Sequence, residues 1–208
     1  MMILFDFDGT LADSIGLGFD LVNSYAEEFG YIQVPRERGR ELSALQIMKE
    51  AHISFRKLPY LVFFFRKKLT ENSSKIKMIP GADQLLSKLK AQGYTLGILT
   101  SHSAEGVDVF LKKYNLESYF SYIKTEVPLF GKKAALRKAR KELKTPFVYV
   151  GDELRDVEAC RKTKVPIVSL PWGFNSFEVL EPKNPGLVAR DTDEAFTLIC
   201  SEAEKIQS

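Results

Sequence analysis

Short apolar runs alternate along most of this chain with longer segments in which apolar residues recur at helical spacing. The apolar runs have the length and composition of buried strands, at residues 2–7, 95–99, 147–150, 166–170 and 187–189, with a further candidate at 122–124. The intervening segments predict helices at residues 81–92, 104–114, 132–144, 153–163 and 191–205. Strands that alternate with helices favour an α/β fold, in which a parallel sheet is covered by helices on both faces. Ligands of such sheets bind beyond the carboxyl ends of the strands.

One long segment, residues 14–79, interrupts this alternation. It contains no convincing strand and predicts helices near residues 15–29, 36–51 and 57–72. About 65 residues is far longer than the usual connection between a strand and the next element. We therefore expect two domains: a Rossmann-like core domain formed by residues 1–13 and 80–208, and a helical cap domain formed by residues 14–79.

The composition of the chain argues against several classes of protein. The 208 residues are 45% hydrophobic and 27% charged, which is typical of a folded globular protein. The net charge of +3 does not predict a nucleic-acid partner, and no apolar run approaches the roughly 20 residues of a membrane span. Two cysteines, Cys160 and Cys200, are too few for a disulfide framework. We expect a cytoplasmic protein that binds neither nucleic acid nor membrane.

Two aspartates, Asp6 and Asp8, stand at alternate positions where the first predicted strand ends. Alternate residues of a strand point to the same side, so both carboxylates can face one site while Phe7 turns into the core. Gly9 permits a turn directly after them. Two like charges this close repel each other, and a divalent cation would relieve the repulsion. A solvated loop with a helix-capping aspartate is the alternative explanation.

Polar side chains also stand at the ends of other predicted strands or at the starts of helices. These are Thr100 and Ser101 after the second strand, Lys132 where a loop meets a helix, and Asp152 and Asp156 after the strand at residues 147–150. Each has an ordinary structural explanation, such as helix capping or solvation. In a parallel sheet, however, these positions converge on one edge, so we expect them to form a site together with the first aspartate pair.

These segments resemble, in the same order along the chain, the four motifs of the haloacid dehalogenase-like hydrolases. The stretch DFDGTLADS is similar to the first motif, DxDGT(L/V)xDS, and GDELRD is similar to the fourth in its GDxxxD form. Thr100 matches the hydroxyl of the second motif, and Lys132 matches the lysine of the third. The helical segment after the first motif and the stretch PWGF at residues 171–174 resemble the phosphoglycolate phosphatase-like branch with a helical cap.

The resemblance implies a Mg²⁺-dependent phosphatase that hydrolyses a small-molecule phosphate ester similar to phosphoglycolate. Asp6 would be the nucleophile that forms an aspartyl-phosphate. Asp8 would protonate the leaving alcohol and then activate water, for which we expect a raised pKa. Mg²⁺ would be held by Asp6, the backbone carbonyl of Asp8 and Asp152.

The remaining motif residues would surround the phosphoryl group. Thr100, Ser101 and Lys132 would bind its oxygens, and Asp156 would orient a water or Lys132 beside the metal. Lys133 adjoins Lys132, so the lysine of the third motif is ambiguous by one position. We choose Lys132 because it follows Phe-Gly directly.

Two other functions stay open from the motifs alone. A sugar-phosphate mutase of the same superfamily would use the same aspartates, and a non-catalytic binding or regulatory domain could retain the fold. The arginines of the cap segment, Arg36, Arg38 and Arg40, could meet a second anionic group of a substrate, although a solvated helix face is the simpler interpretation. His102, two residues after Thr100, could contact a substrate near the cap, although a surface histidine is the simpler interpretation.

Residues 60–65, YLVFFF, place six large apolar side chains in a row on a predicted helix. Such a run covers every face of the helix. Some of these side chains could belong to the core, and others could form a surface for a second subunit. The choice between monomer and homodimer therefore stays open.

Overall fold

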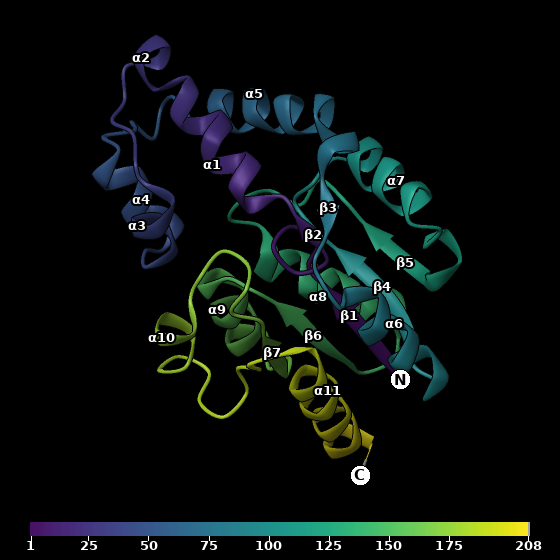
Figure 1. Ribbon diagram of the computed structural model, residues 1–208. Coiled ribbons are helices and arrows are strands. Elements are labelled where there is room, and N and C mark those ends of the chain that lie inside the picture. Colours follow the sequence, from purple (N-terminus) through teal and green to yellow (C-terminus); the bar gives the residue numbers. More distant parts are fainter. Residues whose placement is uncertain (208) are drawn as a thin grey trace.

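The structure, a computed structural model, describes residues 1–207, and its centre is a five-stranded parallel sheet (Figure 1). The strands follow the order β5-β4-β1-β6-β7 across the sheet. Their bounds are β1 Met2–Phe5, β4 Thr95–Leu99, β5 Phe120–Lys124, β6 Phe147–Gly151 and β7 Ile167–Ser169. Each neighbouring pair is parallel, so all the carboxyl ends lie along the same edge of the sheet. The predicted α/β fold is confirmed.

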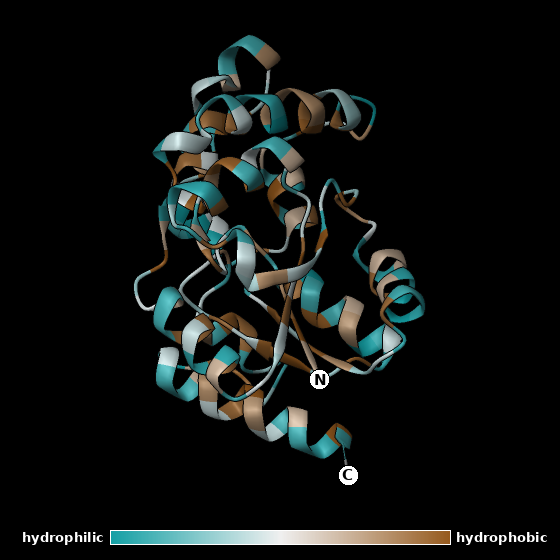
Figure 2. Cartoon of the chain, turned by 90° about the vertical axis from the view of Figure 1, so that its right-hand side faces the viewer, coloured by the Kyte–Doolittle hydropathy of each residue, from teal (hydrophilic) through white to brown (hydrophobic). Residues whose placement is uncertain are grey.

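Helices cover both faces of this sheet, because successive residues of a strand point to opposite sides. Ile3 and Phe5 of β1 pack into one apolar core with α6, α7 and α11, whereas Met2 and Leu4 pack into a second core with α8, α9 and α10. The bounds are α6 Ala82–Ala91, α7 Ala104–Lys113, α8 Lys132–Leu143, α9 Leu154–Thr163, α10 Phe177–Leu180 and α11 Thr192–Gln207, with a 3-10 turn, η2, at Glu117–Tyr119. Figure 2 shows brown strands flanked by helices in which brown and teal alternate.

Two predictions for the sheet need correction, and both concern its edges. Residues 187–189 do not form a strand, because only Val188 bridges to Ser169 of β7. The candidate at residues 122–124 belongs to a longer strand, β5, at the opposite edge. The residues of β5 are not continuously buried, so this strand lacks the unbroken apolar run of the central strands.

A helical insertion, residues 15–75, lies over the carboxyl ends of the strands (Figure 1). It contains α1 Ile15–Ser24, α2 Ala26–Phe29, α3 Arg36–Arg40, α4 Ala44–Glu50, α5 Leu58–Glu71 and a 3-10 turn, η1, at Ser73–Lys75. The helix expected at residues 36–51 is divided in two, because Ser43 and Gln46 form a capping box that begins α4. The helix expected at residues 15–29 is likewise interrupted, at Tyr25. That residues 14–79 form a separate domain stays a prediction.

Two short strands join the helical insertion to the sheet. β2 (Ala12–Asp13) pairs antiparallel with β3 (Lys77–Met78), which places the entry and the exit of the insertion side by side. The expectation of no strand within residues 14–79 is therefore wrong for β3. Strands of this length are set by backbone pairing rather than by an apolar pattern, so periodicity does not reveal them.

The YLVFFF run on α5 is divided between core and surface. Leu61 is buried, and Phe64 and Phe65 pack against aromatic rings at the junction of α1 and α2. Tyr60 and Phe63 are exposed at 57% and 68%. Both interpretations of the run thus hold in part, and the oligomeric state stays a prediction.

No helix within residues 1–207 combines the length and the apolar content that crossing a membrane requires. The most extended one, α11, has 16 residues.

Candidate active site

The carboxylates of Asp6 and Asp152 meet because their strands are neighbours in the sheet. Asp6 directly follows β1, and its backbone N–H continues the ladder by donating to the carbonyl of Val150 in β6 at 2.8 Å. Asp152 directly follows β6, and Asp156 stands in the first turn of α9. Carboxylate oxygens of the three aspartates lie within 4.8 Å of one another. We call Asp6, Asp152 and Asp156 the carboxylate cluster.

One buried lysine, Lys132 at the start of α8, lies against the carboxylate cluster. Its Nζ is 2.6 Å from Asp6 Oδ2 and 2.9 Å from Asp156 Oδ1, and it donates to the Tyr149 hydroxyl at 2.7 Å. Burial lowers the pKa of Lys132, but the charges of Asp156 and Asp6 raise it by more, so the amine stays protonated. Lys133 is exposed, which makes Lys132 the lysine that stands beside the cluster.

Asp152 is held by hydrogen bonds from two segments that lie far apart in the sequence. Its Oδ1 accepts from the Thr10 hydroxyl at 2.8 Å, and its Oδ2 accepts from the N–H of Phe174 at 2.7 Å. Gly9 and Gly173 permit this close packing, because a Cβ at either position would come within 2.1 Å of Asp152 Oδ2. Gly9 also has a φ of +72°, which favours glycine.

The chemistry of the carboxylate cluster fits a divalent cation. Burial raises the pKa of Asp6 despite the opposing charge of Lys132, and burial and the neighbouring carboxylates raise that of Asp152 well above its ordinary value. Both oxygens of Asp156 are buried, and apart from the ion pair of Oδ1 with Lys132 they have no partner among the described residues. Such a surplus of buried negative charge costs free energy unless a cation neutralises it. The cluster therefore suits Mg²⁺, a hard cation that prefers oxygen ligands.

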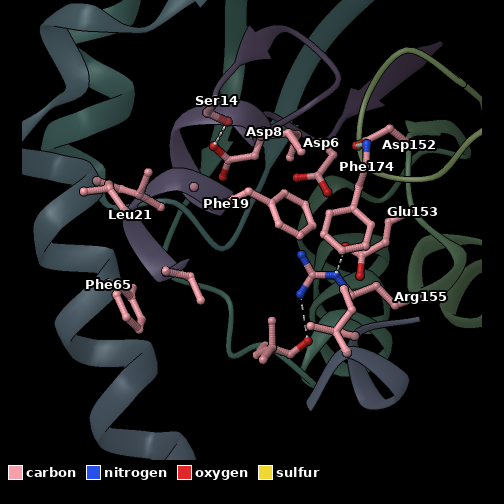
Figure 3. A pocket seen from close by; sticks show the side chains of 17 residues that line it. Asp6, Asp8, Ser14, Phe19, Leu21, Phe65, Asp152, Glu153, Arg155 and Phe174 are labelled. Carbon is pink, nitrogen blue, oxygen red and sulfur yellow. Dashed lines mark hydrogen bonds and ion pairs between the residues drawn. The ribbon is translucent and has the colours of Figure 1, made fainter. Parts of the chain in front are cut away.

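Asp8 lines the same cavity as Asp6, but its carboxylate lies apart from the cluster and contacts other side chains (Figure 3). Its Oδ1 accepts from the Ser14 hydroxyl at 2.5 Å, and His102 Nδ1 lies 3.0 and 3.1 Å from its two oxygens. Burial raises the pKa of Asp8, but the charge and hydrogen bond of His102 and the hydrogen bond of Ser14 lower it below its ordinary value. The raised pKa expected for Asp8 is therefore wrong, because the expectation took no account of the histidine. That its backbone carbonyl binds Mg²⁺ stays a prediction.

His102 is a candidate functional residue whose expected surface position is wrong. It is 4% exposed, and its ring centroid lies 5.1 Å from that of Phe7. Burial lowers the pKa of His102, but the Asp8 carboxylate raises it by more. The available signal was its place two residues after Thr100, at the carboxyl end of a strand, where side chains face the site.

Thr100 and Ser101 follow β4 at the same edge of the sheet. Thr100 is fully buried, and its hydroxyl accepts from the N–H of His102 at 3.0 Å, which shapes this loop. Ser101 lines a small cavity of about 150 Å³ together with Asp8 and His102. Their roles in binding a phosphate group stay predictions.

The carboxylate cluster opens into a cavity of about 320 Å³ beneath the helical insertion (Figure 3). Asp6 and Asp152 line one side of it. Six apolar side chains of the helical insertion also line the cavity, and we call them the apolar wall: Ile15, Leu21, Val22, Ile47, Phe65 and Leu69. In Figure 3, Leu21 and Phe65 of this wall lie across the cavity from Asp6 and Asp152.

Arg155 and Glu153 also face this cavity, and sequence reasoning did not identify Arg155. Glu153 Oε2 lies 2.5 Å from Arg155 Nε, and Arg155 Nη1 donates to the carbonyl of Leu129 at 3.0 Å. Glu153 therefore pairs with the arginine and does not join the carboxylate cluster. The two charges compensate each other within the cavity.

The three arginines considered as ligands of a second anionic group lie outside the cavity. Arg38 pairs with two glutamates on the exposed surface of the helical insertion. Arg40 donates to the carbonyl of Pro171 at 2.7 Å, and Arg36 is exposed. The geometry thus favours the simpler interpretation for this segment.

Known proteins resemble the chain over nearly its whole length. Residues 3–170 match the family of haloacid dehalogenase-like hydrolases. A phosphoglycolate phosphatase of Synechococcus elongatus is 34% identical over 184 residues, which are 86% of this chain and 87% of that protein. A phosphoglycolate phosphatase of Psychrobacter arcticus is 26% identical over 204 residues, which cover 88% of this chain and 89% of that protein. The solved structure of a predicted phosphatase from Clostridium acetobutylicum has a TM-score of 0.81 at 24% identity, covering 96% of this chain and 98% of that one.

The chain belongs to the haloacid dehalogenase-like hydrolases. Within this family it is a hydrolase of the phosphatase type, in the branch that resembles phosphoglycolate phosphatase. The family and the enzyme class expected from the motifs are confirmed.

Proposed function

We propose that this hydrolase is a Mg²⁺-dependent phosphatase that cleaves a small-molecule phosphate monoester, of the phosphoglycolate-like class, through an aspartyl-phosphate on Asp6. The observation that carries the proposal is the position of Asp6. Its carboxylate lies within 4.8 Å of those of Asp152 and Asp156 and 2.6 Å from Lys132. A phosphoryl group bound there would meet a nucleophile, a fixed positive charge and a set of metal ligands at once. The relatives named phosphoglycolate phosphatase support the same class of reaction.

Asp6, Asp152 and the backbone carbonyl of Asp8 would hold Mg²⁺, with Asp156 beside it. When bound, Mg²⁺ supplies positive charge that neutralises the phosphoryl oxygens. Lys132 would remain the fixed charge of the protein itself, because Asp6 and Asp156 keep it protonated.

Thr100 and Ser101 would contribute hydrogen bonds to the phosphoryl group from the end of β4. The position of Thr100 directly after β4, the strand that neighbours β1, supports this role.

Asp6 would act as the nucleophile. One of its carboxylate oxygens would bond to phosphorus while the bond from phosphorus to the ester oxygen breaks, and the electron pair of that bond would leave with the alcohol oxygen. The alcohol oxygen would take a proton from the pair formed by Asp8 and His102, whose nearest atoms are 3.0 Å apart. The same pair would then accept a proton from the water that attacks phosphorus and releases Asp6.

We also propose that the enzyme works in the cytoplasm on a small molecule, as a monomer or a homodimer, without a nucleic-acid or membrane partner. The mild net charge of +3 supports this assignment.

Hydrolysis of para-nitrophenyl phosphate by the purified chain tests the proposed function. We expect turnover in Mg²⁺, and loss of turnover both on chelation with EDTA and in the Asp6→Asn variant. Asp20→Asn changes an exposed carboxylate on α1 and should keep full activity. A wild-type chain that hydrolyses neither this ester nor any ester of a phosphometabolite panel in Mg²⁺ would overturn the proposal.

A further inference from the structure

The apolar wall of the active-site cavity restricts which phosphate ester fits. Its side chains come from three helices of the insertion, α1, α4 and α5. All six are only partly covered by protein atoms, so the cavity keeps apolar surface in reach of water. A ligand that covers this surface gains free energy of binding from the hydrophobic effect.

The residues that line this cavity offer little positive charge to an anionic leaving group, although Arg66 lines the adjoining cavity of about 150 Å³, which shares Asp8 and Phe65 with it. Arg155 is the one cationic side chain among the described residues that line the active-site cavity. Its guanidinium already pairs with Glu153 at 2.5 Å and donates to the carbonyl of Leu129 at 3.0 Å. The Ser14 hydroxyl, which also lines the cavity, donates to Asp8. A carboxylate placed against the apolar wall would lose its water without gaining a partner, which is unfavourable.

The cavity has room for a leaving group of moderate size. Its volume is about 320 Å³. A cavity of about 150 Å³ lined by Leu, Ile and Phe is large enough for a benzene ring. The volume therefore accommodates a phosphoryl group at the carboxylate cluster together with a ring or a short alkyl chain against the apolar wall.

We infer that the substrate is a phosphate monoester of an apolar alcohol, with an alkyl or aromatic leaving group that lies against the apolar wall. This inference rests on the proposed aspartyl-phosphate chemistry and replaces the phosphoglycolate-like ester named there with an ester whose leaving group is apolar. It separates the chain from its relatives named phosphoglycolate phosphatase, because the leaving group of phosphoglycolate carries a carboxylate. The apolar wall offers that carboxylate no charged or hydrogen-bonding partner.

A series of esters tests the inference, with the full chain assayed in Mg²⁺ by phosphate release. The series is ethyl phosphate, n-propyl phosphate, n-butyl phosphate and phosphoglycolate, whose leaving alcohols have similar intrinsic reactivity. We expect kcat/KM to rise about fourfold per added methylene, as burial of each CH₂ implies. We also expect kcat/KM to be at least about tenfold higher for n-butyl phosphate than for phosphoglycolate. A flat alkyl series, or phosphoglycolate hydrolysed as well as n-butyl phosphate, overturns the inference.

A substitution that places a positive charge on the apolar wall provides a second test of the inference. Ile47→Arg adds a cation to the wall, and Leu45→Arg adds the same cation to the same helix, α4, at a position that is 51% exposed and outside the cavity. We expect Ile47→Arg to lower kcat/KM for n-butyl phosphate and to raise it for phosphoglycolate, so that their ratio changes at least about a hundredfold. Leu45→Arg should leave the ratio within about twofold.

A milder variant, Ile47→Ala, serves if Ile47→Arg does not fold. We expect it to lower the ratio of kcat/KM for n-butyl phosphate to that for phosphoglycolate by about tenfold. An unchanged ratio in the variant that folds overturns the inference.

The outcomes separate this inference from the proposed function. Absence of hydrolysis for every ester, para-nitrophenyl phosphate included, overturns both. Hydrolysis that requires Asp6 but prefers phosphoglycolate overturns the inference and supports the proposed function.

Discussion

The two sides of the active-site cavity hold their side chains in place by different forces. In the carboxylate cluster, directional contacts position the charges: Lys132 binds Asp6 and Asp156, and Thr10 donates to Asp152. The side chains of the apolar wall carry no polar group, so the packing of α1, α4 and α5 positions them. A buried charge that loses its partner is strongly destabilising, whereas apolar side chains of similar volume exchange at little cost. The residues at the edge of the sheet therefore determine the reaction, whereas the residues of the helical insertion can change and so determine which substrate binds.

The largest expected effect is the difference in turnover between substitutions on the two sides of the cavity. Asp6→Asn removes the nucleophile and should lower kcat by roughly 10⁴-fold or more. Leu21→Ala removes part of the apolar wall and should lower kcat/KM for para-nitrophenyl phosphate by less than about tenfold. Steady-state kinetics in Mg²⁺ measure both variants. Losses of equal size would contradict the division of roles between the two sides.

A second expected difference concerns stability. Lys132→Met removes the buried cation that contacts two carboxylates, and should lower the free energy of unfolding by about 3–5 kcal/mol. Lys133→Met changes the exposed neighbour and should stay within about 0.5 kcal/mol of the wild type. Urea denaturation followed by circular dichroism measures both. If the two variants are equally stable, the ion pairs of Lys132 are not what holds the cluster together.

Stabilisation of the chain by Mg²⁺ should depend on the carboxylate cluster and not on the apolar wall. A ligand whose concentration is about a hundred times its dissociation constant stabilises a protein by about 2.7 kcal/mol. For a chain of this length, that stabilisation raises Tm by about 5–10 °C. We expect this rise on addition of Mg²⁺ to the wild type and to Leu21→Ala, and its absence in Asp152→Asn. Differential scanning fluorimetry with and without EDTA measures it. A rise that persists in Asp152→Asn would place the metal elsewhere.

The smallest expected effect concerns the histidine that contacts Asp8. His102→Ala should lower kcat about ten- to a hundredfold, because Asp8 loses the group that orients it. His102→Asn keeps an N–H donor near the position of Nδ1 but cannot release a proton, so it should recover only the part of that loss that reflects the orientation of Asp8. His52→Asn, at an exposed position, is the control and should match the wild type. If Asn at position 102 performs no better than Ala, the orientation of Asp8 does not depend on this hydrogen bond.

The sheet and the carboxylate cluster could be predicted from the sequence because both depend on local signals. Each central strand is a continuous apolar run, and Asp6 and Asp152 directly follow two of them. Neighbouring parallel strands then bring their carboxyl ends together whatever the details of the packing. Lys132 is identified by its match to the lysine of the third motif and by its place directly after Phe-Gly, because a helix start alone would indicate a solvated lysine.

The partners of the site residues could not be predicted, because they depend on packing between distant segments. His102 reaches Asp8 across 94 positions of sequence, and the pair reverses the direction expected for the pKa of Asp8. The apolar wall likewise forms only when α1, α4 and α5 of the helical insertion pack over the ends of the strands. The periodicity of apolar residues along the sequence does not indicate which helix faces a cavity.

Chemical trapping of the phosphorylated enzyme tests the central claim most directly. The chain is mixed with n-butyl phosphate or para-nitrophenyl phosphate in Mg²⁺, quenched, and reduced with borohydride, which converts an aspartyl-phosphate to homoserine. Peptide mass spectrometry then locates the change. The account predicts homoserine at position 6 in the wild type and none at Asp8, Asp152 or Asp156. Phosphate release without any modification at Asp6, or modification at another of these aspartates, would contradict it.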